Sequence, residues 1–181
     1  MSNQPTKVIT GKVRLSYCHV FQPTSMGGED PKYSVCLLID KNDKTTIDKM
    51  NAAIKEAEKI GVQSKWDGKK PMGIKLPLRD GDLERGEDHP EYVGKMFVNA
   101  SCKTKPGVVD RDTNPILDST EVYSGCYARA SVNFYAFNTK GNKGIACGLN
   151  NIQKLADGDS LGGRSRAEDD FEVITDEDLL S

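Results

Sequence analysis

The sequence predicts one mainly β domain that closes into a small barrel, carries one inserted α-helix and ends in a separate acidic tail. Long runs in the C-terminal half alternate apolar and polar residues, which is typical of strands with one buried face. A single segment has the spacing of an amphipathic helix. The chain has 181 residues, enough for one domain with a sizeable core.

The N-terminal half predicts two strands and the helix. Residues 7–17 nearly alternate and are expected to form a strand, followed by a long loop rich in Gly and Pro. Residues 33–39 are apolar on both faces, as a central strand covered on two sides would be. The helix is expected over 44–60, with Asp43 as its N-cap and Gly61 just past its end.

The C-terminal half predicts further strands. Residues 62–91 are rich in Gly, Pro and charge and indicate a loop, in which Pro77 confines any short strand to a sheet edge or a bulge. Strands are expected over 95–105 and 125–138, and the latter should pair with a strand over 145–155 as a hairpin.

A closed barrel leaves no free strand edges, and the five-stranded OB barrel is the most economical match to five or so strands. A β-sandwich with a helix is the alternative. The domain is expected to span residues 1–155, and residues 156–181 are expected to form a flexible link and the acidic tail.

The two best strand candidates carry an unusual outer face. The strand over 125–138 has a small, apolar inner row from Cys126 to Ala136, and its outer row is Tyr127, Arg129, Ser131, Asn133, Tyr135 and Phe137. The strand over 95–105 repeats this pattern, with an outer row of Lys95, Phe97, Asn99, Ser101 and Lys103. Aromatic, basic and hydrogen-bonding groups in one row favour a flat, anionic ligand.

Single-stranded nucleic acid fits this mixture, because bases stack on aromatic rings for about 1–3 kcal/mol each and cations contact phosphates. The expected contacts are Tyr127, Arg129, Asn133, Tyr135, Phe137, Lys95, Phe97 and Lys103, with Trp66, Lys69 and Lys70 in the long loop and Lys12 and Arg14 on the first strand. The alternative is that these aromatic side chains pack in the interior, with Trp66 pinning its own loop to the barrel.

Charge divides the chain into two parts. Residues 167–181 hold seven of the 27 acidic side chains and no Lys or Arg, whereas residues 1–166 hold 25 basic against 20 acidic side chains. A negative tail tethered to a positive body competes with nucleic acid for the same surface and is free to recruit partners when a strand displaces it. Its expected partner-binding residues are Phe171, Asp176, Glu177, Asp178, Leu179 and Leu180. The alternative is a tail that only increases solubility.

Other function classes find little support. The chain has two His and no nucleophile or phosphate-loop motif, so we expect no catalytic residues, no metal and no cofactor. The acid-rich run 79–91 leaves a metal-dependent nuclease open, and an adaptor or structural protein with a barrel body is the other alternative. Five Cys without a C-x-x-C pair indicate reduced, buried thiols in a cytosol, and no apolar run is long enough to span a membrane.

The run CYARASVNFYAFN, the strand GIACGLNNIQKL, the link DGDSLGG and the tail EDDFEVITDEDLLS together resemble phage-encoded single-stranded-DNA-binding proteins. The resemblance spans most of the chain and implies an OB-fold body that coats single strands in phage replication, recombination or repair, in the host cytoplasm. It also implies replication or recombination proteins as partners of the tail. Weaker binding to duplex DNA or RNA, and a homodimer, stay open.

Overall fold

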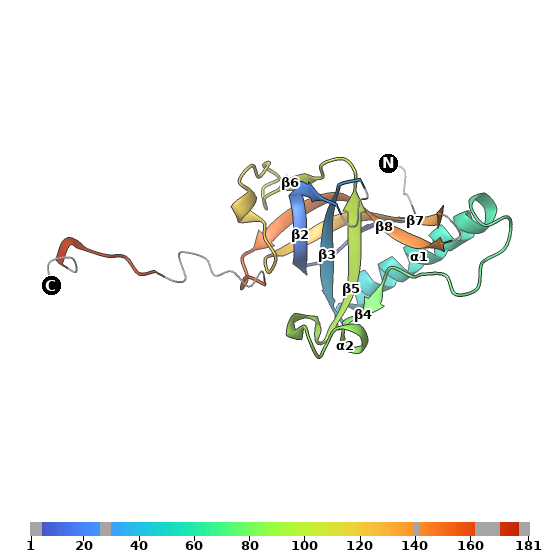
Figure 1. Cartoon of the computed structure of the whole chain (residues 1–181), viewed down its shortest axis with the longest axis horizontal. Coiled ribbons are helices and arrows are strands. Elements are labelled where there is room, and N and C mark those ends of the chain that lie inside the picture. Colours follow the sequence, from blue (N-terminus) through green and yellow to red (C-terminus); the bar gives the residue numbers. More distant parts are fainter. Residues whose placement is uncertain (1–4, 26–29, 140–141, 162–170, 178–181) are drawn as a thin grey trace.

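The body of the protein is a closed β-barrel with one long helix packed across it (Figure 1). The computed structural model describes residues 5–25, 30–139, 142–161 and 171–177. The strands are β1 (Lys7–Ile9), β2 (Val13–Thr24), β3 (Lys32–Asp40), β4 (Arg79–Asp80), β5 (Lys95–Cys102), β6 (Gly107–Val109), β7 (Tyr127–Thr139) and β8 (Asn142–Ala156). The helical elements are α1 (Lys44–Ser64), α2 (Gly81–Glu84) and the 3-10 turns η1 (Pro90–Tyr92) and η2 (Ser119–Glu121).

Five strands close the barrel in the order β2, β3, β5, β8, β7 and back to β2. Neighbours in this circuit are antiparallel, except that β5 and β8 run parallel. The three short strands extend the barrel locally, β1 beside β7, β4 beside β5 and β6 beside β8. The predicted OB-like, mainly β fold with one main helix is therefore confirmed.

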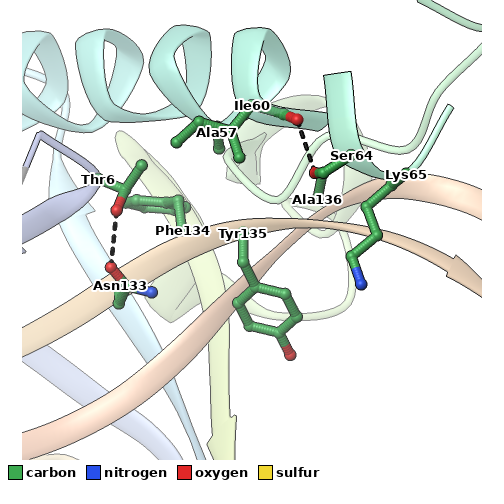
Figure 2. Close-up of a pocket in the computed structure, with 9 residues that line it drawn as sticks. All are labelled: Thr6, Ala57, Ile60, Ser64, Lys65, Asn133, Phe134, Tyr135 and Ala136. Atoms are coloured by element: carbon green, nitrogen blue, oxygen red, sulfur yellow. Dashed lines mark hydrogen bonds between the residues drawn. The ribbon is translucent and has the colours of Figure 1, made fainter. Parts of the chain in front are cut away.

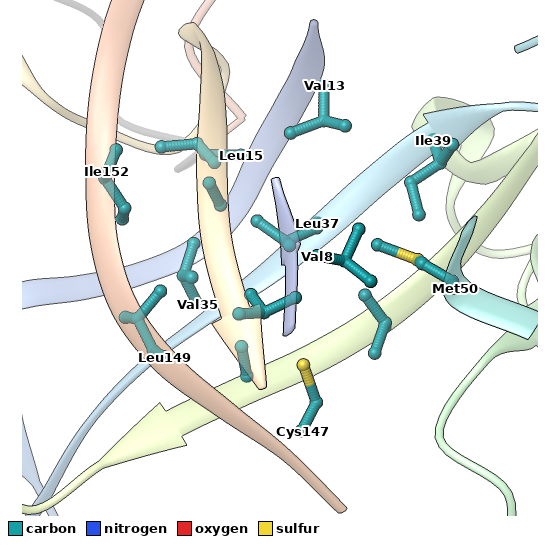
Figure 3. Packing of buried hydrophobic residues seen from close by; sticks show 14 of the residues in the cluster. Val8, Val13, Leu15, Val35, Leu37, Ile39, Met50, Cys147, Leu149 and Ile152 are labelled. Carbon is teal, nitrogen blue, oxygen red and sulfur yellow. The ribbon is translucent and has the colours of Figure 1, made fainter. Parts of the chain in front are cut away.

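The barrel interior is filled by side chains that alternate along each strand, as Figure 3 shows. Leu15 and Leu37 are fully buried at its centre. On α1, Met50, Ala53 and Ala57 recur at helical spacing and face this core. The helix thus covers one opening of the barrel with its apolar face.

The central strand β3 is buried on both sides, as its sequence predicts. Val35, Leu37 and Ile39 point into the barrel interior. Cys36 and Leu38 point to the outside, where they form a second cluster with Tyr92 and Phe97. The outer face of β3 is therefore covered by a segment that lies far away in the sequence.

The prediction of one strand over 7–17 followed by a loop is wrong. Two strands form, separated at Gly11, whose backbone N–H donates to the Thr46 hydroxyl of α1 at 2.9 Å. Strand β2 continues through the expected loop to Thr24. Its pairing with β3 shifts register after Ser16, beside Tyr17 at φ 46°, so a bulge interrupts the alternation on which the prediction depends.

Helix α1 starts where predicted and ends later. The Asp43 side chain accepts a hydrogen bond from the Thr46 N–H at 3.2 Å, which confirms the N-cap. Gly61 does not end the helix. It lies inside α1, where an added Cβ would be 2.5 Å from the Ala136 Cβ and 3.0 Å from the Trp66 ring. The glycine is required by close packing of α1 on β7 rather than by helix termination.

The expected hairpin is confirmed, since β7 and β8 pair from Tyr127 opposite Ala156 to Thr139 opposite Asn142. Its turn, at residues 140–141, lies outside the described residues. The segment 62–91 is more structured than predicted, because it includes β4, α2 and the start of η1.

The start of the expected flexible link, residues 156–161, differs from the prediction. Residues 157–161 are held against the body, for example by a hydrogen bond from the Leu161 N–H to the Ser124 carbonyl at 2.8 Å. Residues 162–166 lie outside the described residues, as do Asp178, Leu179 and Leu180 of the tail. In the described part of the tail, residues 171–177 are exposed, including Phe171, Asp176 and Glu177.

Candidate nucleic-acid interface

The outer row of β7 is arranged as predicted. Its inner row is buried up to Phe134, whereas the outer row from Tyr127 to Phe137 is exposed or half-buried. Arg129 is exposed, and its Nε donates to the Gln153 side chain on β8 at 2.6 Å. Tyr135 is 45% exposed, the largest value for an aromatic ring in this row. The row offers aromatic and hydrogen-bonding groups on the face of the barrel away from the core.

The Tyr135 ring lies beside Gly148 of β8, which has no side chain. A Cβ on Gly148 of β8 would be 3.5 Å from the Tyr135 ring. Figure 2 shows Tyr135 projecting from β7 to the side away from α1. On the α1 side, a cavity of about 200 Å³ lies beside the contact of α1 with β7, lined by Thr6, Ala57, Ile60, Ser64, Lys65, Asn133, Phe134, Tyr135 and Ala136. The Thr6 hydroxyl donates to Asn133 at 2.9 Å, which orients that side chain at the edge of the cavity.

The opposite end of the row combines an aromatic ring with two cations. Lys12 Nζ lies 5.2 Å and Arg14 Cζ 5.8 Å from the centroid of the Tyr127 ring. Within about 6 Å, such cations are attracted to the ring face. The structure therefore brings together three residues that the sequence predicts as contacts on two separate strands.

The expectation that Phe97 lies exposed in an outer row is wrong. Its side chain does point outward from β5, but it is 1% exposed. Tyr92 of η1 packs edge-on against the ring at 5.1 Å, and the guanidinium groups of Arg79 and Arg85 lie 5.3 and 5.8 Å from its centroid. Arg79 and Arg85 belong to the segment 62–91 that the sequence predicts as a loop, and Tyr92 directly follows it. Phe97 has no free ring face for a base.

The expectation of an exposed Trp66 is also wrong, and the alternative that it pins its own loop is correct. Trp66 is 2% exposed, and its Nε1 donates to the Phe137 carbonyl at 3.1 Å. The indole thus joins the end of α1 to β7. Its neighbour Lys69 is exposed, whereas Lys70 forms an ion pair with Glu58 at 3.2 Å.

The two basic residues of the β5 row have different environments. Lys95 lies 3.5 Å from the Asp40 carboxylate on β3. Hydrogen bonding to the backbone of Asn42 and the nearby charge of Lys95 lower the pKa of Asp40. Lys103 is exposed just past the end of β5. Lys103 is therefore the better placed of the two to contact a phosphate.

Sequence reasoning missed a further group of aromatic and basic residues on β2. Tyr17 is 52% exposed, and Lys105 Nζ lies 5.5 Å from the centroid of the Phe21 ring. Tyr17 was expected to end the first strand, and Phe21 was expected to lie in the loop after it. They could have been found only by recognising that β2 continues past a bulge to Thr24.

The acid-rich run 79–91 is engaged in structural contacts. Lys41 donates to Asp80 at 2.8 Å and to Asp82 at 2.6 Å, and these hydrogen bonds lower the pKa of both carboxyls. Asp80 also accepts from the backbone at the start of α2. Over the described residues, no cluster of three or more His, Cys, Asp or Glu side chains is suited to hold a metal ion.

The described cysteines are unpaired, and burial raises the pKa of the Cys18 thiol to about 12 and of the Cys36 thiol to about 11. They therefore remain protonated near neutral pH. None of the described helices combines the length and apolar character needed to cross a membrane.

Residues 6–180 match the model of a protein family described as the single-stranded-DNA-binding protein of Enterobacter phage Enc34. The chain belongs to this family. It is also 33% identical, over 97% of its length and 99% of the other protein, to putative protein p50 of Acyrthosiphon pisum secondary endosymbiont phage 1. The resemblance to phage single-stranded-DNA-binding proteins is thus confirmed.

Solved structures of phage single-stranded-DNA-binding proteins share the fold of this chain. The Enc34 single-stranded-DNA-binding protein in complex with single-stranded DNA superposes with a TM-score of 0.78 at 25% identity, over 88% of this chain and 91% of that one. The single-stranded-DNA-binding protein of bacteriophage T7 superposes with a TM-score of 0.63 at 14% identity, over 93% and 98% of the two chains. The second likeness supports the fold alone.

Proposed function

We propose that this chain binds single-stranded DNA without sequence preference during phage DNA replication, recombination or repair. The observation that carries this proposal is the outer face of β7, where the half-exposed Tyr135 and Arg129 share one row with Tyr127 and its two cations. Flat rings can stack on any base, and cations follow the phosphates. The family membership supports the same ligand.

The proposed contact set differs from the one expected from sequence. It keeps the β7 row, Lys12 and Arg14, with Lys69 and Lys103 as exposed cations. It leaves out Phe97 and Trp66, because neither ring is accessible. It adds Tyr17 and the Phe21–Lys105 pair as candidates for a second stacking region.

We expect fluorescently labelled oligo-dT and a mixed-sequence oligonucleotide to bind with similar affinity. If three of the proposed cations contact phosphates at once, affinity falls about 100-fold for a tenfold rise in salt, because each contact releases counterions. Binding should weaken without vanishing, since stacking persists when phosphate contacts are screened. Fluorescence anisotropy at several salt concentrations measures both effects. Absence of binding at low salt would instead favour the adaptor alternative, and degradation of the probe in Mg²⁺ or Mn²⁺ would favour a nuclease.

We propose that the acidic tail competes with DNA for this surface and recruits replication or recombination proteins once displaced. The support is electrostatic, since residues 167–181 carry seven acidic groups and no basic one. The described part of the tail leaves Phe171, Val173 and Ile174 exposed among its acids. These apolar side chains can be buried against a partner protein, which adds apolar contact to the attraction between charges.

Truncation after Arg166 is expected to raise the affinity for oligo-dT about tenfold at low salt, because the tethered competitor is removed. The gain should shrink as salt screens the tail from the body. A matched full-length variant with Asp176→Asn, Glu177→Gln and Asp178→Asn separates charge from chain length and should show part of the gain. Equal affinity of the full and truncated chains at low salt would leave the tail no competitive role.

A further inference from the structure

A short segment, residues 157–161, lies on the body before the acidic tail begins, and we call it the strap. It carries two acidic side chains, Asp157 and Asp159. The Tyr123 hydroxyl contacts the Asp157 side chain at 3.1 Å and the Gly158 backbone at 3.0–3.1 Å. The Leu161 N–H donates to the Ser124 carbonyl at 2.8 Å. The strap therefore has defined contacts at both of its ends.

Two glycines allow the strap to lie directly on the backbone that leads into β7. An added Cβ on Gly158 would be 2.2 Å from the Gly125 carbonyl oxygen. Gly125 has φ +118°, and an added Cβ there would be 2.0 Å from the Asp159 carbonyl oxygen. Only residues without side chains permit this approach from both sides.

The strap touches two groups that the proposed function assigns to DNA. The Arg14 guanidinium donates to the Asp159 carbonyl at 2.7 Å and to the Gly125 carbonyl at 3.1 Å. An added Cβ on Gly158 would also be 2.8 Å from Cε2 of the Tyr127 ring. Arg14 therefore donates one hydrogen bond to the strap, and the strap covers one edge of the Tyr127 ring.

The end of the strap reaches the outer face of β3 and β5. Leu161 packs against the second apolar cluster, formed by Cys36, Leu38, Tyr92 and Phe97. These are the second and third strands of the barrel circuit, and in OB folds the face of these two strands binds oligonucleotides and oligosaccharides. The strap thus runs from Tyr127 to the apolar cluster on the outer face of β3 and β5.

We propose that Arg14 and Tyr127 form a nucleotide site that the strap closes in the free protein, and that a bound single strand displaces the strap. The Arg14 guanidinium then binds a phosphate in place of the Asp159 carbonyl, and the Tyr127 ring stacks on a base. This inference rests on the proposed function and adds a second competitor to it. The strap contacts Arg14 and Ser124 through its backbone and the second apolar cluster through the Leu161 side chain, and it carries two carboxylates against seven in the tail. Closure by the strap is therefore expected to be less sensitive to salt than competition by the acidic tail.

The size of the effect follows from how often the strap is open. If about one molecule in ten is open, the apparent affinity for DNA is lowered about tenfold, because only that fraction is competent to bind. A variant whose strap is permanently open should regain this tenfold affinity for DNA. Truncation after Arg166 leaves the strap in place and should not regain it.

Two substitutions in the full-length chain test the strap by different means. Leu161→Ala removes its apolar anchor, and Gly158→Ala forces it off the Gly125 backbone. Both are expected to bind oligo-dT about three- to tenfold more tightly than the unmodified chain, at about 50 mM and about 500 mM salt alike. Leu117→Ala is the matched control, because Leu117 is 88% exposed and is not among the strap's partners Arg14, Tyr123, Ser124 and Gly125, and it should not change affinity. Unchanged or weaker binding by both strap variants would overturn the proposal.

Hydrogen exchange provides a second measurement on the unmodified chain. Addition of oligo-dT should speed exchange of the Leu161 amide, which is bonded to Ser124 in the free protein. The Thr10 amide, bonded to the Ala130 carbonyl between β1 and β7, serves as the internal control and should not speed up. Slower or unchanged exchange at Leu161 while the DNA is bound would overturn displacement of the strap. It would leave the proposed function intact, which fails only if the DNA does not bind.

Discussion

Replacing Phe97 by Ala lowers the free energy of unfolding by about 3–5 kcal/mol, as is typical for a buried Phe. The ring is 1% exposed and fills the space between β3, β5 and η1, in contact with Tyr92. Its loss leaves a cavity and also removes the surface over which Arg79 and Arg85 lie. Chemical denaturation of the purified variant measures the change.

Tyr135→Ala is the matched comparison for Phe97→Ala, because both side chains point outward from the barrel while only Tyr135 is accessible. It should change stability far less and weaken oligo-dT binding by about 1–3 kcal/mol, or about 5- to 150-fold. The opposite result, in which Phe97→Ala stays stable and loses DNA binding, would return Phe97 to the interface.

Replacing Trp66 by Ala is expected to cost a similar 3–5 kcal/mol, or about as much as other buried Trp side chains. The indole packs beside Gly61 and its Nε1 is bonded to the Phe137 carbonyl, so it holds the end of α1 on β7. Trp66→Phe keeps an aromatic ring there and loses mainly the hydrogen bond, which predicts a smaller cost of about 1 kcal/mol before any repacking.

Fluorescence gives an independent check on the environment of Trp66. Because its ring has no free face, oligo-dT should not quench the single Trp by stacking, even at saturation. Denaturation curves of the two variants and an emission titration of the unmodified chain are the measurements. Strong quenching combined with normal stability of Trp66→Ala would show that the indole moves into the interface.

Alternation along the chain was sufficient to assign the two faces of β7. Small and apolar residues recur at every second position from Cys126, and the structure buries this row up to Phe134. A period of two follows directly from strand geometry, so it can be read without knowing the partner strand. The same holds for α1, whose N-cap and apolar spacing depend on neighbours within a few residues.

Bulges and close contacts could not be predicted from alternation or helical spacing. The shift after Ser16 in β2 depends on pairing with β3, and it hid the second half of the strand. Gly61 has the local signature of a helix end, yet it is required by the approach of α1 to Ala136 and Trp66. The β3 partner of Ser16 and the Ala136 neighbour of Gly61 each lie more than ten residues away in the sequence, and only Trp66 is close to Gly61 along the chain.

The pattern of residues thus established the long strands β3, β5, β7 and β8, the main helix, the inner and outer faces of β7, and the separation of a positive body from a negative tail. It could not establish which outward aromatic side chains remain accessible, because a strand's period says which way a ring points and not what lies over it. Accessibility depends on segments that fold over the rings. Tyr92 of η1 covers Phe97, α1 covers Trp66, and the strap reaches Arg14 and Tyr127. These covering segments meet the barrel only after the chain has folded, since their contacts are specified by shape and burial over long sequence separations.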